Sequence, residues 1–168
     1  YSISGLTINR TQTSKVGLFG TTTGATIRNL GVTNDNITGN EWVGSLVGFA
    51  QSYTTIDNCS VSGSVASTYI TGGLVGYAYT NTIIRNSYST ASVNGGTGNH
   101  TGGFVGFIYR STIQNSYSTG SVVTSSSGRG GLVGGTISTT INNSFYDATT
   151  SGQSDTGKGI GKTTAEMK

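Results

Sequence analysis

The chain has 168 residues and a formal net charge of +3, and only 15 residues are charged (9 basic and 6 acidic). Gly, Ser, Thr and Asn together supply more than half of the sequence, and proline is absent. This composition excludes a coiled coil, which needs far more Ala, Glu, Lys and Leu, and collagen, which needs Gly-X-Y triplets rich in proline. A single cysteine excludes an internal disulfide, and no apolar run approaches the roughly 20 residues of a membrane span.

The spacing of the apolar residues argues against disorder. Leu, Ile, Val and Phe make up only about a fifth of the chain, but they recur in five repeats of about 28 residues. Each repeat contains a short core that ends in glycine, and the closing glycines are Gly20, Gly48, Gly76, Gly106 and Gly134. An Ile-x-Asn triplet follows in every repeat, and its isoleucines are Ile27, Ile56, Ile84, Ile113 and Ile141. A third recurring position holds a β-branched apolar residue, and its members are Ile37, Val65, Val93 and Val122.

In chain order, residues 1–15 alternate apolar and polar side chains, which predicts a leading strand or hairpin that covers the first repeat. Residues 16–146 hold the five repeats, each with three short β-branched segments separated by turn residues, and these predict three short strands per repeat. Residues 147–168 are richer in charge and predict a terminal cap or a linker. Within them, residues 163–168 resemble a short helical start capped by Thr163. The whole chain is expected to form a single domain.

A unit of 28 residues with three strands cannot bury its own apolar face, whereas stacked copies of that unit can. The sequence therefore predicts an all-β protein, a parallel β-helix (β-solenoid) of about five coils, on the order of 25 Å long at about 4.8 Å per coil. Asparagines at one repeated position are expected to form a structural ladder of side-chain amides between coils. Those asparagines are Asn29, Asn58, Asn86, Asn115 and Asn143.

The segments "GGLVGYAYTNTIIRNSYSTASVNG", beginning at Gly72, and "GGFVGFIYRSTIQNSYSTGSV", beginning at Gly102, closely resemble the GLUG motif. The first ten residues and the final "GKTTAEMK" look like the usual flanks of GLUG arrays. The resemblance is weakest in the first coil, at Lys15-Val16, and in the fifth, where Gly135-Thr136 replace an aromatic-aliphatic pair.

This resemblance implies a right-handed β-solenoid in a large secreted or surface-anchored microbial protein, as in filamentous-haemagglutinin-like adhesins. It implies no catalytic residues and no cofactor. The expected location is extracellular or at the cell surface. The expected partners are neighbouring domains of a longer chain, or identical subunits that stack end to end.

Polysaccharide-active enzymes also use β-solenoids, but their sites need convergent carboxylates. Asp57 falls level with Arg28 and Arg85 of the adjacent coils, which predicts a surface charge ladder, and the remaining acids occupy unrelated repeat positions. The sequence therefore predicts no catalytic site. His100 lies in a Gly-rich stretch predicted to be a solvated loop, and no second His or Cys supports a metal site. The nine basic residues are dispersed, so no nucleic-acid partner is expected.

Two other surfaces offer alternatives. A recurring threonine series (Thr26, Thr55, Thr112 and Thr140) could template ice, but Ile83 interrupts it and charged residues flank it. Aromatic residues recur after the closing glycine, and such rings can either pack in the protein or stack on sugars. The predicted glycan-contact residues are Tyr77, Tyr79, Phe107 and Tyr109. The leading hypothesis is a non-catalytic structural or adhesive module, as an adhesin stalk or a filament subunit, and a carbohydrate-binding module is the alternative.

Overall fold

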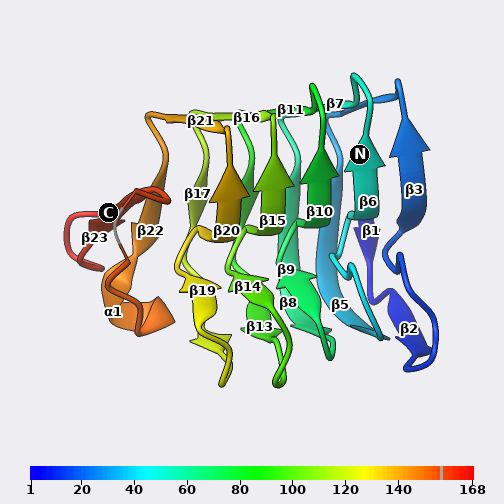
Figure 1. The fold of residues 1–168 in the computed structure, drawn as a ribbon, viewed down its shortest axis with the longest axis horizontal. Helices are drawn as coiled ribbons and strands as arrows, with labels where there is room; N and C mark the ends of the chain where they lie inside the picture. Colours follow the sequence, from blue (N-terminus) through cyan, green and yellow to red (C-terminus); the bar gives the residue numbers. More distant parts are fainter. Residues whose placement is uncertain (156) are drawn as a thin grey trace.

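The structure is a computed structural model that describes residues 1–155 and 157–168, and nearly all of its regular structure is β-strand (Figure 1). Strands from successive repeats pair in parallel, residue for residue; Ile84, for example, lies between Ile56 and Ile113. In Figure 1 the front strands run upward, the fainter strands behind run downward, and the chain advances from right to left. The coil is therefore right-handed, as expected for parallel crossovers. The predicted all-β, right-handed β-solenoid is confirmed.

Four parallel sheets run along the solenoid, and three of them contain the predicted strands. The aromatic sheet contains β3 (Phe19–Thr23), β6 (Val47–Gln51), β10 (Val75–Tyr79), β15 (Val105–Tyr109) and β20 (Val133–Ile137). The threonine sheet contains β4 (Thr26–Arg28), β7 (Thr55–Asp57), β11 (Ile83–Arg85), β16 (Thr112–Gln114) and β21 (Thr140–Asn142). The long sheet contains β1 (Ser2–Ser4), β2 (Thr7–Arg10), β5 (Gly31–Gly39), β8 (Ser60–Ala66), β12 (Tyr88–Ser89), β13 (Ser92–Asn94), β17 (Tyr117–Ser118), β18 (Val122–Val123), β22 (Phe145–Asp147) and β23 (Ile160–Lys162).

The short sheet was not predicted. It contains β9 (Ile70–Gly72), β14 (His100–Gly102) and β19 (Gly128–Gly130), each just before the Gly-(Leu/Phe)-Val-Gly core of its repeat. Its three strands read ITG, HTG and GRG, so they share no apolar pattern that a sequence scan could detect. They pair because this segment of each coil lies in register beside the same segment of the next coil. Its backbone N–H and C=O groups need hydrogen-bond partners, and the neighbouring coil supplies them.

The interior consists of columns of apolar side chains, one from each coil. One column is formed by Leu46, Leu74, Phe104 and Leu132, and another by Ile56, Ile84 and Ile113; all seven side chains have 0% exposure. Burying a side chain of this size contributes roughly 1.5–3 kcal/mol. The stability of the fold therefore comes from stacking between coils and not from any single coil.

The repeated closing glycine is required by a close approach of backbones. A Cβ atom placed on Gly106 would lie 2.6 Å from the carbonyl oxygen of Gly76 and 2.9 Å from the carbonyl carbon of Thr71. Thr71 belongs to the short sheet, whose backbone therefore runs against the aromatic sheet at this point. Because no larger residue fits, the glycine recurs once in every coil.

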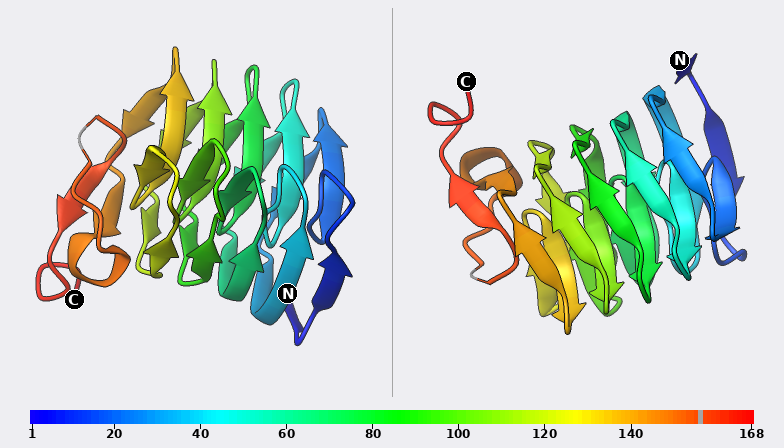
Figure 2. Two further views of the ribbon diagram at one scale, coloured as in Figure 1. Left: turned by 60° about the horizontal axis from the view of Figure 1, so that its bottom comes forward. Right: turned by 90° about the horizontal axis from the view of Figure 1, so that it is seen from above.

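The N-terminal end of the solenoid is formed by β1 and β2, which both pair in parallel with β5. The two strands therefore extend the long sheet and do not form a hairpin with each other. Beside them, β3 and β4 are the outermost strands of the aromatic and threonine sheets. In Figure 2 these blue strands make up one end of the stack, and the orange and red segments cross the other end.

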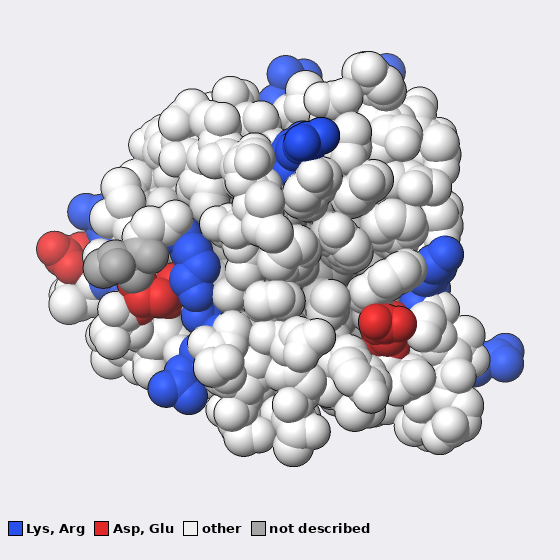
Figure 3. All heavy atoms as spheres, viewed as in Figure 1, with Lys and Arg blue, Asp and Glu red and all other residues white. Residues whose placement is uncertain are grey.

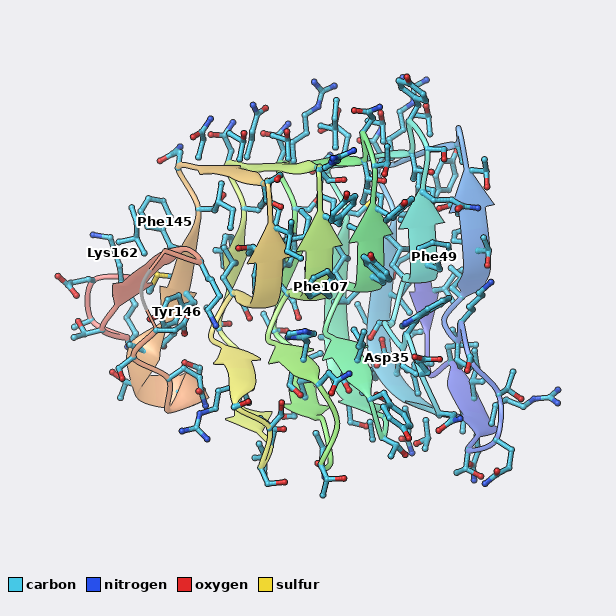
Figure 4. The ribbon with its side chains drawn as sticks, in the orientation of Figure 1. Asp35, Phe49, Phe107, Phe145, Tyr146 and Lys162 are labelled. Carbon is cyan, nitrogen blue, oxygen red and sulfur yellow. The ribbon has the colours of Figure 1, made fainter. Side chains whose placement is uncertain are left out.

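The C-terminal end is covered by residues after the fifth coil. Tyr146 is 2% exposed and fills the interior beside Gly131, and its hydroxyl donates to the carbonyl of Asp155 at 2.8 Å (Figure 4). The short helix α1 (Ala148–Ser151) begins at Asp147, and β23 then adds a strand to β22, which the sequence did not predict. The expected helical start at 163–168 forms only a capped turn, in which the N–H and hydroxyl of Thr163 donate to Glu166.

Candidate functional site

The outer face of the aromatic sheet carries a continuous row of rings. Phe49, Tyr77 and Phe107 are paired in register on β6, β10 and β15, and their ring centroids are 5.3 Å apart at each step (Figure 4). Trp42 extends the row, with its ring centroid 4.9 Å from that of Phe49. Trp42 was not predicted from the sequence; it lies one residue before Val43, which pairs with Thr71 of the next coil. Each of these rings is half-buried.

The predicted glycan-contact residues Tyr77, Tyr79, Phe107 and Tyr109 lie together on this face, but they pack against one another. Tyr79 and Tyr109 are stacked, with centroids 5.2 Å apart and planes inclined by 12°. The guanidinium of Arg110 also lies 5.1 Å from the centroid of the Tyr109 ring. A sugar stacks on the face of an aromatic ring, and these faces are already in contact with protein groups. The arrangement leaves mainly ring edges and hydroxyls for a ligand.

His100 is not in a solvated loop, so that expectation is wrong. It begins β14, its ring centroid lies 4.5 Å from that of Phe107, and its Nδ1 atom is buried without a hydrogen-bond partner. Burial and the nearby charge of Lys158 lower the pKa of His100. A Cβ atom on Gly135 would lie 2.5 Å from Nδ1. The departure of the fifth coil from the repeat pattern therefore makes room for this imidazole.

The five repeated asparagines occupy one corner of the coil, between the threonine and long sheets, and all have positive φ between 45° and 56°. Their amides form a ladder: Asn58 donates to Asn29 at 2.8 Å and Asn143 donates to Asn115 at 2.8 Å. Asn86 departs from the series, because its amide donates to Asp57 and not to Asn58. Asn tolerates this left-handed conformation better than most residues other than glycine, which is a second reason for its recurrence beside the ladder.

Asn115→Ala is expected to lower the free energy of unfolding by about 1–2 kcal/mol, because alanine is strained at positive φ and lacks the amide. Asn115→Gly separates the two causes, since glycine relieves the strain but still loses the ladder. Thermal and urea unfolding should rank wild type above Asn115→Gly and Asn115→Gly above Asn115→Ala. Equal stability of all three proteins would show that neither the conformation nor the ladder contributes.

Two of the acidic side chains are held by local hydrogen bonds. Asp57 accepts hydrogen bonds from Asn86 at 2.8 Å and from Arg85 at 3.0 Å, and these two partners, Asn86 first, lower the pKa of Asp57. Burial alone would raise the pKa of Asp147, but hydrogen bonds from the Thr150 N–H and the Thr164 hydroxyl outweigh it, so the pKa is lowered. Within residues 1–155 and 157–168, no three His, Cys, Asp or Glu side chains gather as a metal site would require.

Side chains of the C-terminal segment occupy backbone groups at the edge of the last coil. Gln153 donates to the carbonyl of Val122 at 3.3 Å, Asp155 accepts from the N–H of Gly131 at 2.9 Å, and Lys158 donates to the carbonyl of Gly134 at 3.1 Å. Lys158 also donates to the carbonyl of Arg129. These contacts occupy groups that a further coil would otherwise pair with.

Comparison with known proteins identifies the repeat. The family model described as the GLUG motif matches residues 39–66, 67–94 and 97–123, which confirms the resemblance read from the sequence. The matches fall on the central coils, and both departures noted in the sequence, at Lys15-Val16 and Gly135-Thr136, lie outside them. No solved structure matches this chain.

Two curated relatives are much longer than this chain. A Gly-rich membrane protein of Evansella cellulosilytica is 44% identical over 91 residues, which are 51% of this chain and 10% of the relative. Halomucin of Haloquadratum walsbyi is 36% identical over 114 residues, which are 64% of this chain and 1% of the relative. Across the described residues of this chain, no helix has the length and apolar character needed to cross a membrane.

Proposed function

We propose that this chain, which contains three GLUG motif repeats, is a non-catalytic structural module of a microbial surface or secreted protein. The observation that carries the proposal is that many polar side chains bind groups of neighbouring coils. The asparagine ladder and the C-terminal contacts of Gln153, Asp155 and Lys158 all join backbone or side chains of neighbouring coils. Side chains used in this way hold a rod together and are not free to act on a substrate.

The matched relatives support an extracellular or cell-surface location, since one is named as a Gly-rich membrane protein and the other as Halomucin. Two finer roles are compatible with that location. A stalk that holds an adhesive domain away from the cell needs a rigid solenoid joined to other domains. A head-to-tail filament needs open strand edges at both ends. The blocked edge at the C-terminal end favours the stalk.

The absence of catalysis is part of the proposal. Its support is that Asp57 is bound to Arg85, Asp147 caps α1 and Asp155 binds the Gly131 N–H, so each of these three carboxylates has a local structural partner. A hydrolytic pair would instead place two carboxyl groups about 5–10 Å apart across an open cleft.

Antibody labelling of the source cells tests the location. Antibodies raised against residues 1–168 should label intact cells or the culture medium before permeabilisation. Labelling that appears only after permeabilisation would contradict a surface role. An antibody against a cytoplasmic protein of the same cells serves as the control for membrane integrity.

A further inference from the structure

A groove of about 450 Å³ follows the corner between the aromatic and threonine sheets. The corner between these two sheets forms the upper edge of the molecule in Figure 1. Its main lining residues are Tyr53, Asn81, Ile83, Arg110, Thr112 and Thr140. They come from four successive coils, so the groove extends over three coil steps, about 14 Å. That length suits a short chain of linked units better than a single small molecule.

Two bulky residues at this corner adopt a conformation that does not suit them. Tyr53 has φ of 67° and Arg110 has φ of 45°, whereas the same corner uses Gly24 in the first coil and Asn81 in the third. The left-handed conformation is unfavourable for large side chains. The fold gains little packing in return, since Tyr53 is 73% exposed and Arg110 is also exposed, with its guanidinium over the ring of Tyr109. Residues held in a strained backbone conformation often lie at ligand-binding sites.

The electrostatics of the groove favour an anion. Arg110 is its one charged lining residue, and no carboxylate lines it. Asp57, the acidic residue on the strands of the threonine sheet, is bound to Arg85 and Asn86. Figure 3 shows blue side chains and no red ones along the upper edge of this view. An approaching carboxylate would therefore meet a cation without a competing acid.

We propose that this groove binds an acidic polysaccharide, one whose sugar units carry carboxylates. The exposed ring of Tyr53 offers a face for a pyranose, which the packed rings of Tyr79 and Tyr109 do not. The guanidinium of Arg110 can hold a carboxylate through two N–H donors. The hydroxyls of Thr112 and Thr140 and the amide of Asn81 can bond to sugar hydroxyls. This role goes beyond the structural one and does not depend on it.

Binding should be measured by titration calorimetry at low salt, with a hexamer of galacturonic acid as the probe and a neutral glucose hexamer beside it. The groove variants are Tyr53→Asn and Arg110→Asn, because asparagine suits positive φ and should preserve the fold. The matched controls are Tyr69→Asn and Arg129→Gln, which change an exposed ring and an exposed cation outside the groove. Circular dichroism and melting temperature verify that each variant folds.

The acidic hexamer should bind and the neutral one should bind more weakly. Each groove variant should weaken binding roughly tenfold or more, and each control should bind like the wild type. No binding of the acidic hexamer, equal affinity for both hexamers, or controls that lose as much affinity as the groove variants would overturn the proposal. None of these outcomes affects the antibody labelling, so failure here is distinguishable from failure of the surface role.

Discussion

Gly106→Ala is expected to lower the free energy of unfolding by about 3 kcal/mol, at the upper end of the usual cost of overpacking. The new methyl group would lie 2.6 Å from the carbonyl oxygen of Gly76 and 2.9 Å from the backbone of Thr71. Both contacts are with backbone atoms that already pair between coils, so they cannot move without breaking strand pairing. Because each coil is stabilised by its neighbours, the damage should spread to the coils on either side. Urea unfolding measures the loss.

Gly31→Ala is the matched control, since Gly31 also lies in a paired strand. There the added methyl group would lie 3.3 Å from one flexible atom, the hydroxyl oxygen of Ser60. The expected change is below about 1 kcal/mol, because a flexible side chain can shift. If both substitutions cost the same, the close approach of the short sheet is not the reason for the repeated glycine.

Asp35→Asn is expected to make the protein more stable at neutral pH. Asp35 lies at a register shift between β5 and β8, its side chain is 3% exposed, and neither carboxyl oxygen has a hydrogen-bond partner. Burial is the main cause that raises the pKa of Asp35 to about 6, and the nearby Ser45 hydroxyl and Ser64 N–H only moderate the rise. Folding therefore places an ionised carboxylate in an unfavourable site once the pH exceeds this pKa.

The raised pKa determines how the stability of the wild-type protein changes with pH. Below about pH 3.8 the carboxyl is protonated in both states, so it imposes no charge penalty. As the pH rises to about 6 the unfolded chain loses the proton first, and stability falls until the penalty is complete above that value. The shift of about two pH units corresponds to about 3 kcal/mol. The stability gap between Asp35→Asn and wild type should therefore widen by about this amount between pH 3.5 and pH 7.5.

Asp57→Asn is the control with the opposite sign. Hydrogen bonds from Asn86 and Arg85 lower the pKa of Asp57, so ionisation stabilises the fold, and the variant should be the less stable protein at neutral pH. Urea unfolding of the three proteins across this pH range provides the comparison. A gap between Asp35→Asn and wild type that does not change with pH would show that the Asp35 carboxyl is not held in an unfavourable site.

The repeat spacing was enough to predict the coil, the register and the apolar columns. Ile56, Ile84 and Ile113 recur at almost constant intervals, and only a stacked parallel arrangement brings them together. Features that depend on the backbone were not predictable in the same way. The short sheet has no side-chain pattern. The register shift at Asp35 follows from one extra residue in a single coil, because Thr33 and Asn34 of β5 lie opposite the single residue Ser62 of β8.

The candidate sites were predicted less completely. The repeat spacing gives the position of each aromatic residue along the coil, but it does not give the orientation of the side-chain ring. The sequence placed Tyr79 and Tyr109 together, yet it could not show that they stack on each other. It treated His100 as solvated because the stretch before it is rich in glycine, whereas Gly135 of the next coil opens a space for the imidazole. Tyr53 and Arg110 are ordinary residues in sequence, and only their positive φ distinguishes them.

The two ends of the solenoid differ in a way that bears on assembly. At the C-terminal end, Gln153, Asp155 and Lys158 occupy edge groups, and β21, the outermost strand of the threonine sheet, has only three residues. Short edge strands and charged side chains both oppose edge-to-edge pairing. At the N-terminal end, Arg10 is the last residue of β2 and Arg28 is the last residue of β4, so two copies meeting there would bring like charges together and repel each other.

Light scattering of the purified 168-residue chain across a wide concentration range, with negative-stain electron microscopy of the same samples, tests the central claim most directly. A solenoid with a blocked C-terminal edge should stay at its monomer mass of 17.2 kDa at every concentration and form no filaments. A mass that rises with concentration, together with filaments of coils stacked end to end, would contradict the closed end and support a self-assembling subunit.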